Sequence, residues 1–112
     1  MSYDYFFFAK PGDGKVLAID AIGPDLPSIG SLEFVRGEIS RAFPAVRWEP
    51  PRGEIRAWFG LQGPPEFLLL PEDGGKLSCF KAAFIEREEV LALAASMNLV
   101  AFDPQRGEIL GA

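Results

Sequence analysis

The pattern of apolar and polar positions predicts a strand at the start of the chain and two helices further on. Residues 3–9 carry apolar side chains on both faces of a predicted strand, as in a strand that is covered on both sides inside a sheet. Residues 31–43 repeat apolar side chains at helical spacing, with Ser28 or Ser31 as the N-cap. Residues 86–97 form the second predicted helix, because glutamates occupy its first turn and apolar residues follow.

The middle and the end of the chain carry the short apolar runs and the turn residues that are typical of antiparallel strands. These predicted strands are 46–49, 54–59, 66–70, 76–84, 99–102 and 108–110. Segment 15–22 fits a short strand and a helical turn equally well. Strands grouped together beside two helices predict one α+β domain over residues 1–112. We expect a sandwich in which a mainly antiparallel sheet of about five to seven strands packs against two main helices.

Charge and composition narrow the classes of partner. The chain has 112 residues, of which 48% are hydrophobic, and 16 acidic against 11 basic residues give a net charge of −5. Its Lys and Arg residues are scattered, so we expect no nucleic-acid partner. No apolar run reaches the roughly 18 residues of a membrane span, and the start of the chain has no basic signal region. With a free cysteine as well, these features predict a cytoplasmic protein that does not enter a membrane.

The chemistry available to the side chains is limited. The sequence has no histidine and one cysteine, which excludes a Ser-His-Asp triad, a Cys-His pair and an intramolecular disulfide. We therefore expect no catalytic residue, no metal site and no cofactor. Cys79 is interpreted as a small buried hydrophobic residue, since a reactive thiol would need a cation such as Lys76 or Lys81 beside it.

Two acidic or glycine-rich motifs have simple structural explanations. The run Gly12–Lys15 lacks the glycine and the Ser or Thr of a phosphate-binding loop, so it is predicted to be a turn. Glu86 and Glu89 share a face of the second helix and could in principle hold a hard cation. The first turn of a helix favours carboxylates by itself, and the chain has no Glu-x-x-His set that would complete a di-metal site.

The cluster most suggestive of binding lies around the first predicted hairpin. Trp48 and Trp58 come close together if this hairpin forms, with arginines beside them. Such rings either fill the core or anchor a partner, as Trp and Arg do at binding hot spots. The candidate partner contacts are Trp48, Glu49, Arg52 and Glu54 on the first hairpin and Glu72 and Asp73 on the second.

Three segments carry a resemblance to a known group of proteins. They are the opening 1–8, the helix end Ala42-Phe43-Pro44, and residues 98–105, which close on Asp-Pro-Gln. In this order they resemble a class of small uncharacterised bacterial cytoplasmic proteins, many of which look like immunity proteins of polymorphic toxin systems. These segments are structural signatures (a first strand, a helix stop and a turn), so no binding residue is carried over from the class.

The leading functional hypothesis is a non-enzymatic protein-binding domain, an immunity protein that occludes a cognate toxin. Small size, an acidic balance, the missing catalytic residues and the resemblance support it. A small-molecule-binding or regulatory domain with an aromatic-lined pocket is the alternative. An enzyme that uses only carboxylates is a third hypothesis, and it requires paired acids in a cleft.

Overall fold

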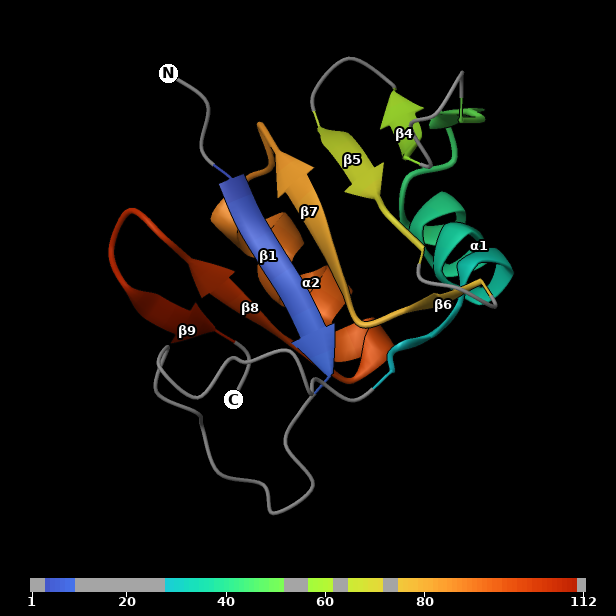
Figure 1. Ribbon diagram of the computed structural model, residues 1–112. Helices are drawn as coiled ribbons and strands as arrows, with labels where there is room; N and C mark the ends of the chain where they lie inside the picture. The colour runs from blue at the N-terminus through green and yellow to red at the C-terminus, as the bar shows by residue number, and fades with distance from the viewer. Residues whose placement is uncertain (1–3, 10–27, 52–56, 62–64, 72–74, 111–112) are drawn as a thin grey trace.

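A seven-stranded antiparallel sheet forms the body of the protein, and two helices pack against one of its faces (Figure 1). The computed structural model describes residues 4–9, 28–51, 57–61, 65–71 and 75–110. In spatial order the strands are β3 (Arg47–Glu49), β4 (Trp58–Leu61), β5 (Glu66–Leu69), β7 (Cys79–Ala83), β1 (Asp4–Ala9), β8 (Leu99–Asp103) and β9 (Glu108–Leu110). The predicted α+β class is confirmed. Segment 15–22, which the pattern left open between strand and helix, lies outside the described residues.

Strand β1 lies inside the sheet, as the apolar run over residues 5–9 predicts. It pairs with β7 on one side and with β8 on the other, so both of its edges are occupied. Tyr5 and Phe7 join the core beneath the helices, whereas Phe8 belongs to a second cluster on the opposite face. The Phe7 ring stacks on Phe80 of β7 with 4.7 Å between centroids and 7° between planes. Rings buried on both faces supply the apolar area that a small domain needs.

Helix α1 (Leu32–Ala42) places Val35 and Ile39 in the core, at the spacing that predicted it. Its N-cap is Ser31, whose Oγ accepts a hydrogen bond of 3.1 Å from the backbone N–H of Phe34. The first turn of a helix leaves its N–H groups without backbone acceptors, and a serine cap satisfies one of them. Of the two serines that the sequence offered, Ser31 therefore begins the helix.

Helix α2 (Arg87–Met97) begins and ends close to its predicted bounds. The backbone N–H of Glu86 donates to Glu89 Oε1 at 3.1 Å, which is one half of a capping box. The helix ends at Asn98, whose φ of 56° is left-handed, a conformation that asparagine adopts more readily than most residues. The side chains that α2 buries are Val90, Leu93, Ala94 and Met97.

The first predicted hairpin has a different register from the one expected. A turn at residues 50–53 would pair Glu49 with Glu54, whereas Glu49 pairs with Phe59. Pro50 and the proline after it have no N–H group to donate, so the ladder of β3 cannot continue past Glu49. The residues that pair with β3 therefore lie further along the chain than a tight turn at residues 50–53 would place them.

The strand predicted over residues 76–84 is two strands. Its first part, β6 (Lys76–Leu77), pairs with β2 (Gly30–Ser31) in a small separate sheet, and its second part is β7. β6 pairs with β2 and not with β5. The pair of β5 and β7 nearest the turn is therefore Leu69 opposite Phe80. The second hairpin is thus wider than the Asp-Gly signal predicts.

The terminal hairpin of β8 and β9 is confirmed. Asp103 pairs with Glu108 and is fully buried. Its Oδ1 accepts hydrogen bonds from the backbone N–H of Gln105 at 3.0 Å and of Arg106 at 3.3 Å. Gly107 follows with a φ of 63°, which glycine adopts without steric cost. The buried carboxylate thus stabilises the turn that the Asp-Pro sequence predicts.

Candidate partner-binding face

The sheet face turned away from α1 and α2, here called the outer face, carries a continuous row of side chains. The pairing registers place one residue of each strand in this row, which comprises Glu49, Phe59, Leu68, Lys81, Phe6, Phe102 and Ile109. Part of the outer face is buried, where Phe8 of β1 packs against Val100 and Phe102 of β8, whereas Phe6 of β1 is exposed. On β4 it is more open, and the Phe59 side chain is 41% exposed. Figure 1 looks onto this face, with α2 behind the sheet.

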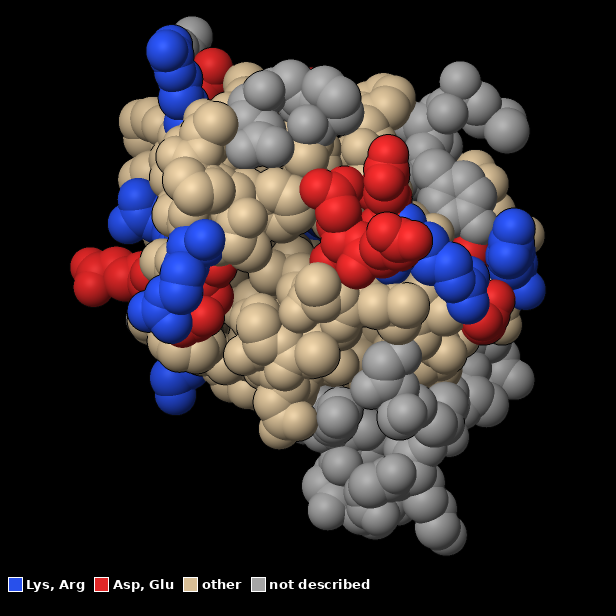
Figure 2. Space-filling view, turned by 180° about the vertical axis from the view of Figure 1, so that it is seen from behind, with Lys and Arg blue, Asp and Glu red and all other residues tan. Residues whose placement is uncertain are grey.

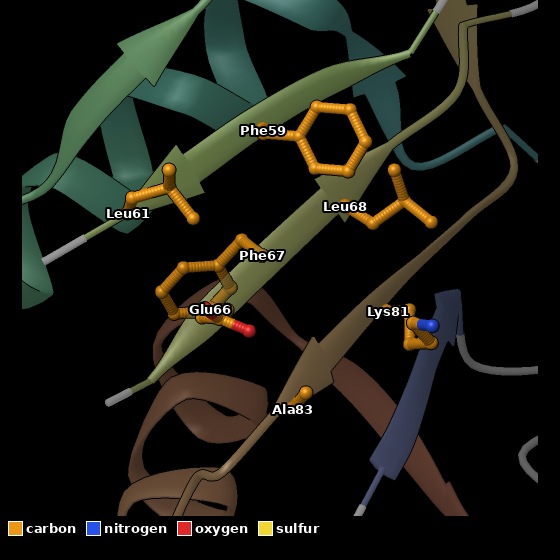
Figure 3. Close-up of a pocket in the computed structure, with 7 residues that line it drawn as sticks. All are labelled: Phe59, Leu61, Glu66, Phe67, Leu68, Lys81 and Ala83. Atoms are coloured by element: carbon orange, nitrogen blue, oxygen red, sulfur yellow. The ribbon is translucent and has the colours of Figure 1, made fainter. Parts of the chain in front are cut away.

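A hollow of about 280 Å³ opens on the exposed half of the outer face. It is lined by Phe59, Leu61, Glu66, Phe67, Leu68, Lys81 and Ala83. Figure 3 shows that these residues come from three adjacent strands, β4, β5 and β7. Five of the seven are apolar, so the hollow offers mainly hydrocarbon and aromatic surface with two charged groups.

The two charged groups of the hollow do not pair with each other. In Figure 3 the Glu66 carboxylate and the Lys81 ammonium lie on opposite sides of the hollow. Glu66 is exposed and Lys81 is half-buried. Within the described residues, the ion pairs are Arg41 with Glu38 and Arg87 with Glu108, so neither charge of the hollow takes part in one.

The two tryptophans of the suggestive cluster lie on the helix side of the sheet. Trp48 and Trp58 are partly buried and pack against the main core. Trp48 Nε1 donates to Ser40 Oγ of α1 at 2.9 Å. The Arg36 guanidinium lies 4.3 Å from the centroid of the Trp58 ring. The structure thus favours the core interpretation of both rings, and the arginine beside Trp58 comes from α1.

The remaining predicted contacts are placed only in part. Glu49 is exposed and lies on the outer face, opposite Phe59 in the register. Trp48 faces the helices instead, so the two described candidates point to opposite sides of the sheet. The other four candidates, Arg52, Glu54, Glu72 and Asp73, lie outside the described residues.

Substitution of Gly60 by alanine is expected to destabilise the protein by about 1–3 kcal/mol, the usual cost of overpacking. A Cβ at this position would lie 2.7 Å from Trp48 Cζ3, and that ring is tethered through its hydrogen bond to Ser40. Gly37, in the middle of α1, is the matched control because its added Cβ would meet nothing within 4 Å. There alanine should stabilise by about 1 kcal/mol. Urea unfolding of both variants measures the difference, and equal effects would contradict the Trp48 packing.

Cys79 lies on β7 at the outer face, opposite Phe8. The side chain is only partly buried, in contrast to the predicted buried residue, but this burial still raises the pKa of the thiol to about 11, as expected of an unreactive group. At pH 8 iodoacetamide should therefore alkylate folded protein far more slowly than urea-unfolded protein, as mass spectrometry can follow. Because the folded pKa is the higher one, the thiol also lowers stability progressively from about pH 9 to about pH 11. Equal alkylation rates in both states would contradict this burial.

The glutamates at the start of α2 remain explained by the helix itself. Figure 2 shows the helix side of the protein, where acidic side chains gather over the N-terminal end of α2. The described part of the chain contains no group of three or more Cys, Asp and Glu side chains that could hold a metal ion. Among the described helices, none has the length and apolar character needed to cross a membrane.

The residues of the hollow were not among the sequence-based candidates. Phe59 and Lys81 lie in predicted strands, but nothing in the sequence says which face each side chain occupies. The signal is visible only once Phe59, Leu68 and Lys81 are aligned by register. Searches of family models, of curated proteins and of solved structures found no match to the chain.

Proposed function

We propose that this chain is a non-enzymatic protein-binding domain that docks a partner on its outer face. The observation that carries this proposal is the exposed apolar surface around the hollow. Phe6 and Phe59 are 37% and 41% exposed. They lie in the same row of the sheet, which runs in the order Phe59, Leu68, Lys81 and Phe6. Aromatic side chains exposed together on one face are typical of protein interfaces.

We further propose that the partner is a bacterial toxin and that the chain is its immunity protein. The resemblance of the chain to immunity proteins and its net charge of −5 support this. The mechanism is steric, because a sheet face seated on a toxin excludes the toxin's substrate. An acidic inhibitor also approaches a basic toxin faster, since opposite net charges steer the encounter.

A small-molecule-binding domain is the second candidate, and the aromatic lining of the hollow favours it. Sites for small molecules usually enclose about 300–1,000 Å³ and bury most of the ligand surface. The hollow has about 280 Å³ and is open on the face of a sheet. An open site of this size suits the side chains of a docked protein better than an enclosed metabolite.

The decisive test of the immunity function is a co-expression experiment. The reading frame beside the gene for this chain is expressed in a bacterial host, alone and together with the chain. We expect growth arrest in the first case, restored growth in the second, and a purified complex of the two products. Growth arrest that the chain does not relieve, or a neighbouring product that is harmless, overturns the immunity function. A metabolite that co-purifies with the chain, seen by native mass spectrometry, favours the second candidate instead.

A further inference from the structure

Lys81 occupies an unusual position for a lysine, near the middle of a sheet and between apolar neighbours. Its register partners on the two adjacent strands are Leu68 of β5 and Phe6 of β1. Its side chain is half-buried and forms one wall of the hollow. The four methylene groups of a lysine can cover apolar surface of this kind while the ammonium stays in water.

The ammonium of Lys81 has no counter-ion in the described part of the chain. The acidic side chains on the outer face nearest in register are Asp4, Glu49 and Glu66. None of them forms an ion pair with Lys81 within 4.0 Å, and the Glu66 carboxylate lies across the hollow from it. In the free protein water solvates this charge at little cost.

A partner that covers the outer face changes the solvation of Lys81. The Lys81 ammonium would then lose water while Leu68 and Phe6 on either side offer it no hydrogen-bond acceptor. A charge that is buried without a counter-ion opposes binding strongly, because the lost hydration is not replaced. A partner that docks here must therefore supply a hydrogen-bond acceptor for the ammonium. A carboxylate is the best acceptor, because it also carries the opposite charge.

We propose that the hollow takes an apolar side chain of the partner together with a neighbouring Asp or Glu, whose carboxylate pairs with Lys81 Nζ. This inference rests on the proposed protein-binding function and specifies its chemistry. The apolar side chain packs against Phe59, Leu61 and Leu68, and the carboxylate reaches the β7 side of the hollow. The net charge of this chain acts at long range and speeds the approach of a basic partner. The single carboxylate of the partner acts only at short range, in contact with Lys81.

Two short peptides test the proposal without the natural partner. Acetyl-Phe-Glu-Phe-amide and acetyl-Phe-Gln-Phe-amide are titrated into ¹⁵N-labelled protein, and the amide signals of Phe59, Leu68 and Lys81 are followed by NMR. We expect the Glu peptide to bind about fivefold more tightly than the Gln peptide, the value of one partly exposed ion pair. High salt should remove this difference, since salt screens such pairs.

Substitutions at Lys81 identify the group responsible. Lys81→Met should bind both peptides equally, while Lys81→Arg keeps the preference for Glu. Circular dichroism of each variant checks that the fold is kept, and an unfolded Lys81→Met variant is replaced by Lys81→Gln. Equal binding of the two peptides to the unchanged protein, or no shift at millimolar peptide, overturns the carboxylate proposal. Neither result changes the outcome expected of the growth experiment, which tests the protein-binding function separately.

A third probe separates a protein segment from a free metabolite as the source of the carboxylate. 3-Phenylpropionate carries the same ring and acid without a peptide backbone. If it shifts the amides of the hollow while both peptides leave them unchanged, the hollow binds a small acid and the partner proposal is overturned. If the Glu peptide binds at least as tightly as the free acid, a protein segment is supported.

Discussion

Replacement of Phe7 by alanine is expected to lower the free energy of unfolding by about 3–5 kcal/mol. The Phe7 side chain has no exposed surface and stacks on Phe80 at 4.7 Å. Strand β1 is held between β7 and β8, so the backbone cannot move inward to fill the cavity that the ring would leave. A loss of this size is a large share of the roughly 5–15 kcal/mol that stabilises a typical domain.

The neighbouring Phe6 is a control of the same residue type on the same strand. Its side chain lies on the outer face and is 37% exposed, so Phe6→Ala should cost about 1 kcal/mol or less. Urea denaturation followed by tryptophan fluorescence gives both free energies. If the two variants lost the same stability, the assignment of Phe7 to the core face and of Phe6 to the outer face would be wrong.

The parts of the fold that local physics determines were predictable from the sequence. The apolar run over residues 5–9 of β1 predicted an interior strand, because a strand with apolar side chains on both faces is usually inside a sheet. The start of α1 follows from Ser31, which supplies an acceptor, and the end of α2 follows from Asn98, which tolerates a left-handed backbone. These signals involve residues within one helical turn of each other.

The parts that depend on distant pairing were not predictable. Glu49 pairs with Phe59 because two prolines interrupt the ladder, and β6 leaves the sheet because β2 lies beside it. The hollow requires three registers to be right at once, since it joins β4, β5 and β7. A shift of one residue in any of them would turn Phe59, Leu68 or Lys81 to the other face.

The outer-face proposal predicts that Phe59→Asp weakens binding of the cognate toxin by about 100-fold. Phe59 is 41% exposed, lines the hollow and lies next to Leu68, so a docked partner would bury its ring. An aspartate there removes this apolar area. Its carboxylate would also repel the Asp or Glu that we expect the partner to bring to Lys81. Calorimetry of the complex and rescue of growth on co-expression measure the loss.

Phe34→Asp is the matched control, because it makes the same change on a different surface. Phe34 lies on α1, the helix that packs against the opposite face of the sheet, and it is 48% exposed. This variant should keep full affinity and full rescue if the toxin docks on the outer face. Loss of binding in Phe34→Asp with none in Phe59→Asp would place the toxin on the helix side. The two variants thus decide between the faces, because each introduces one charge at a phenylalanine of similar exposure.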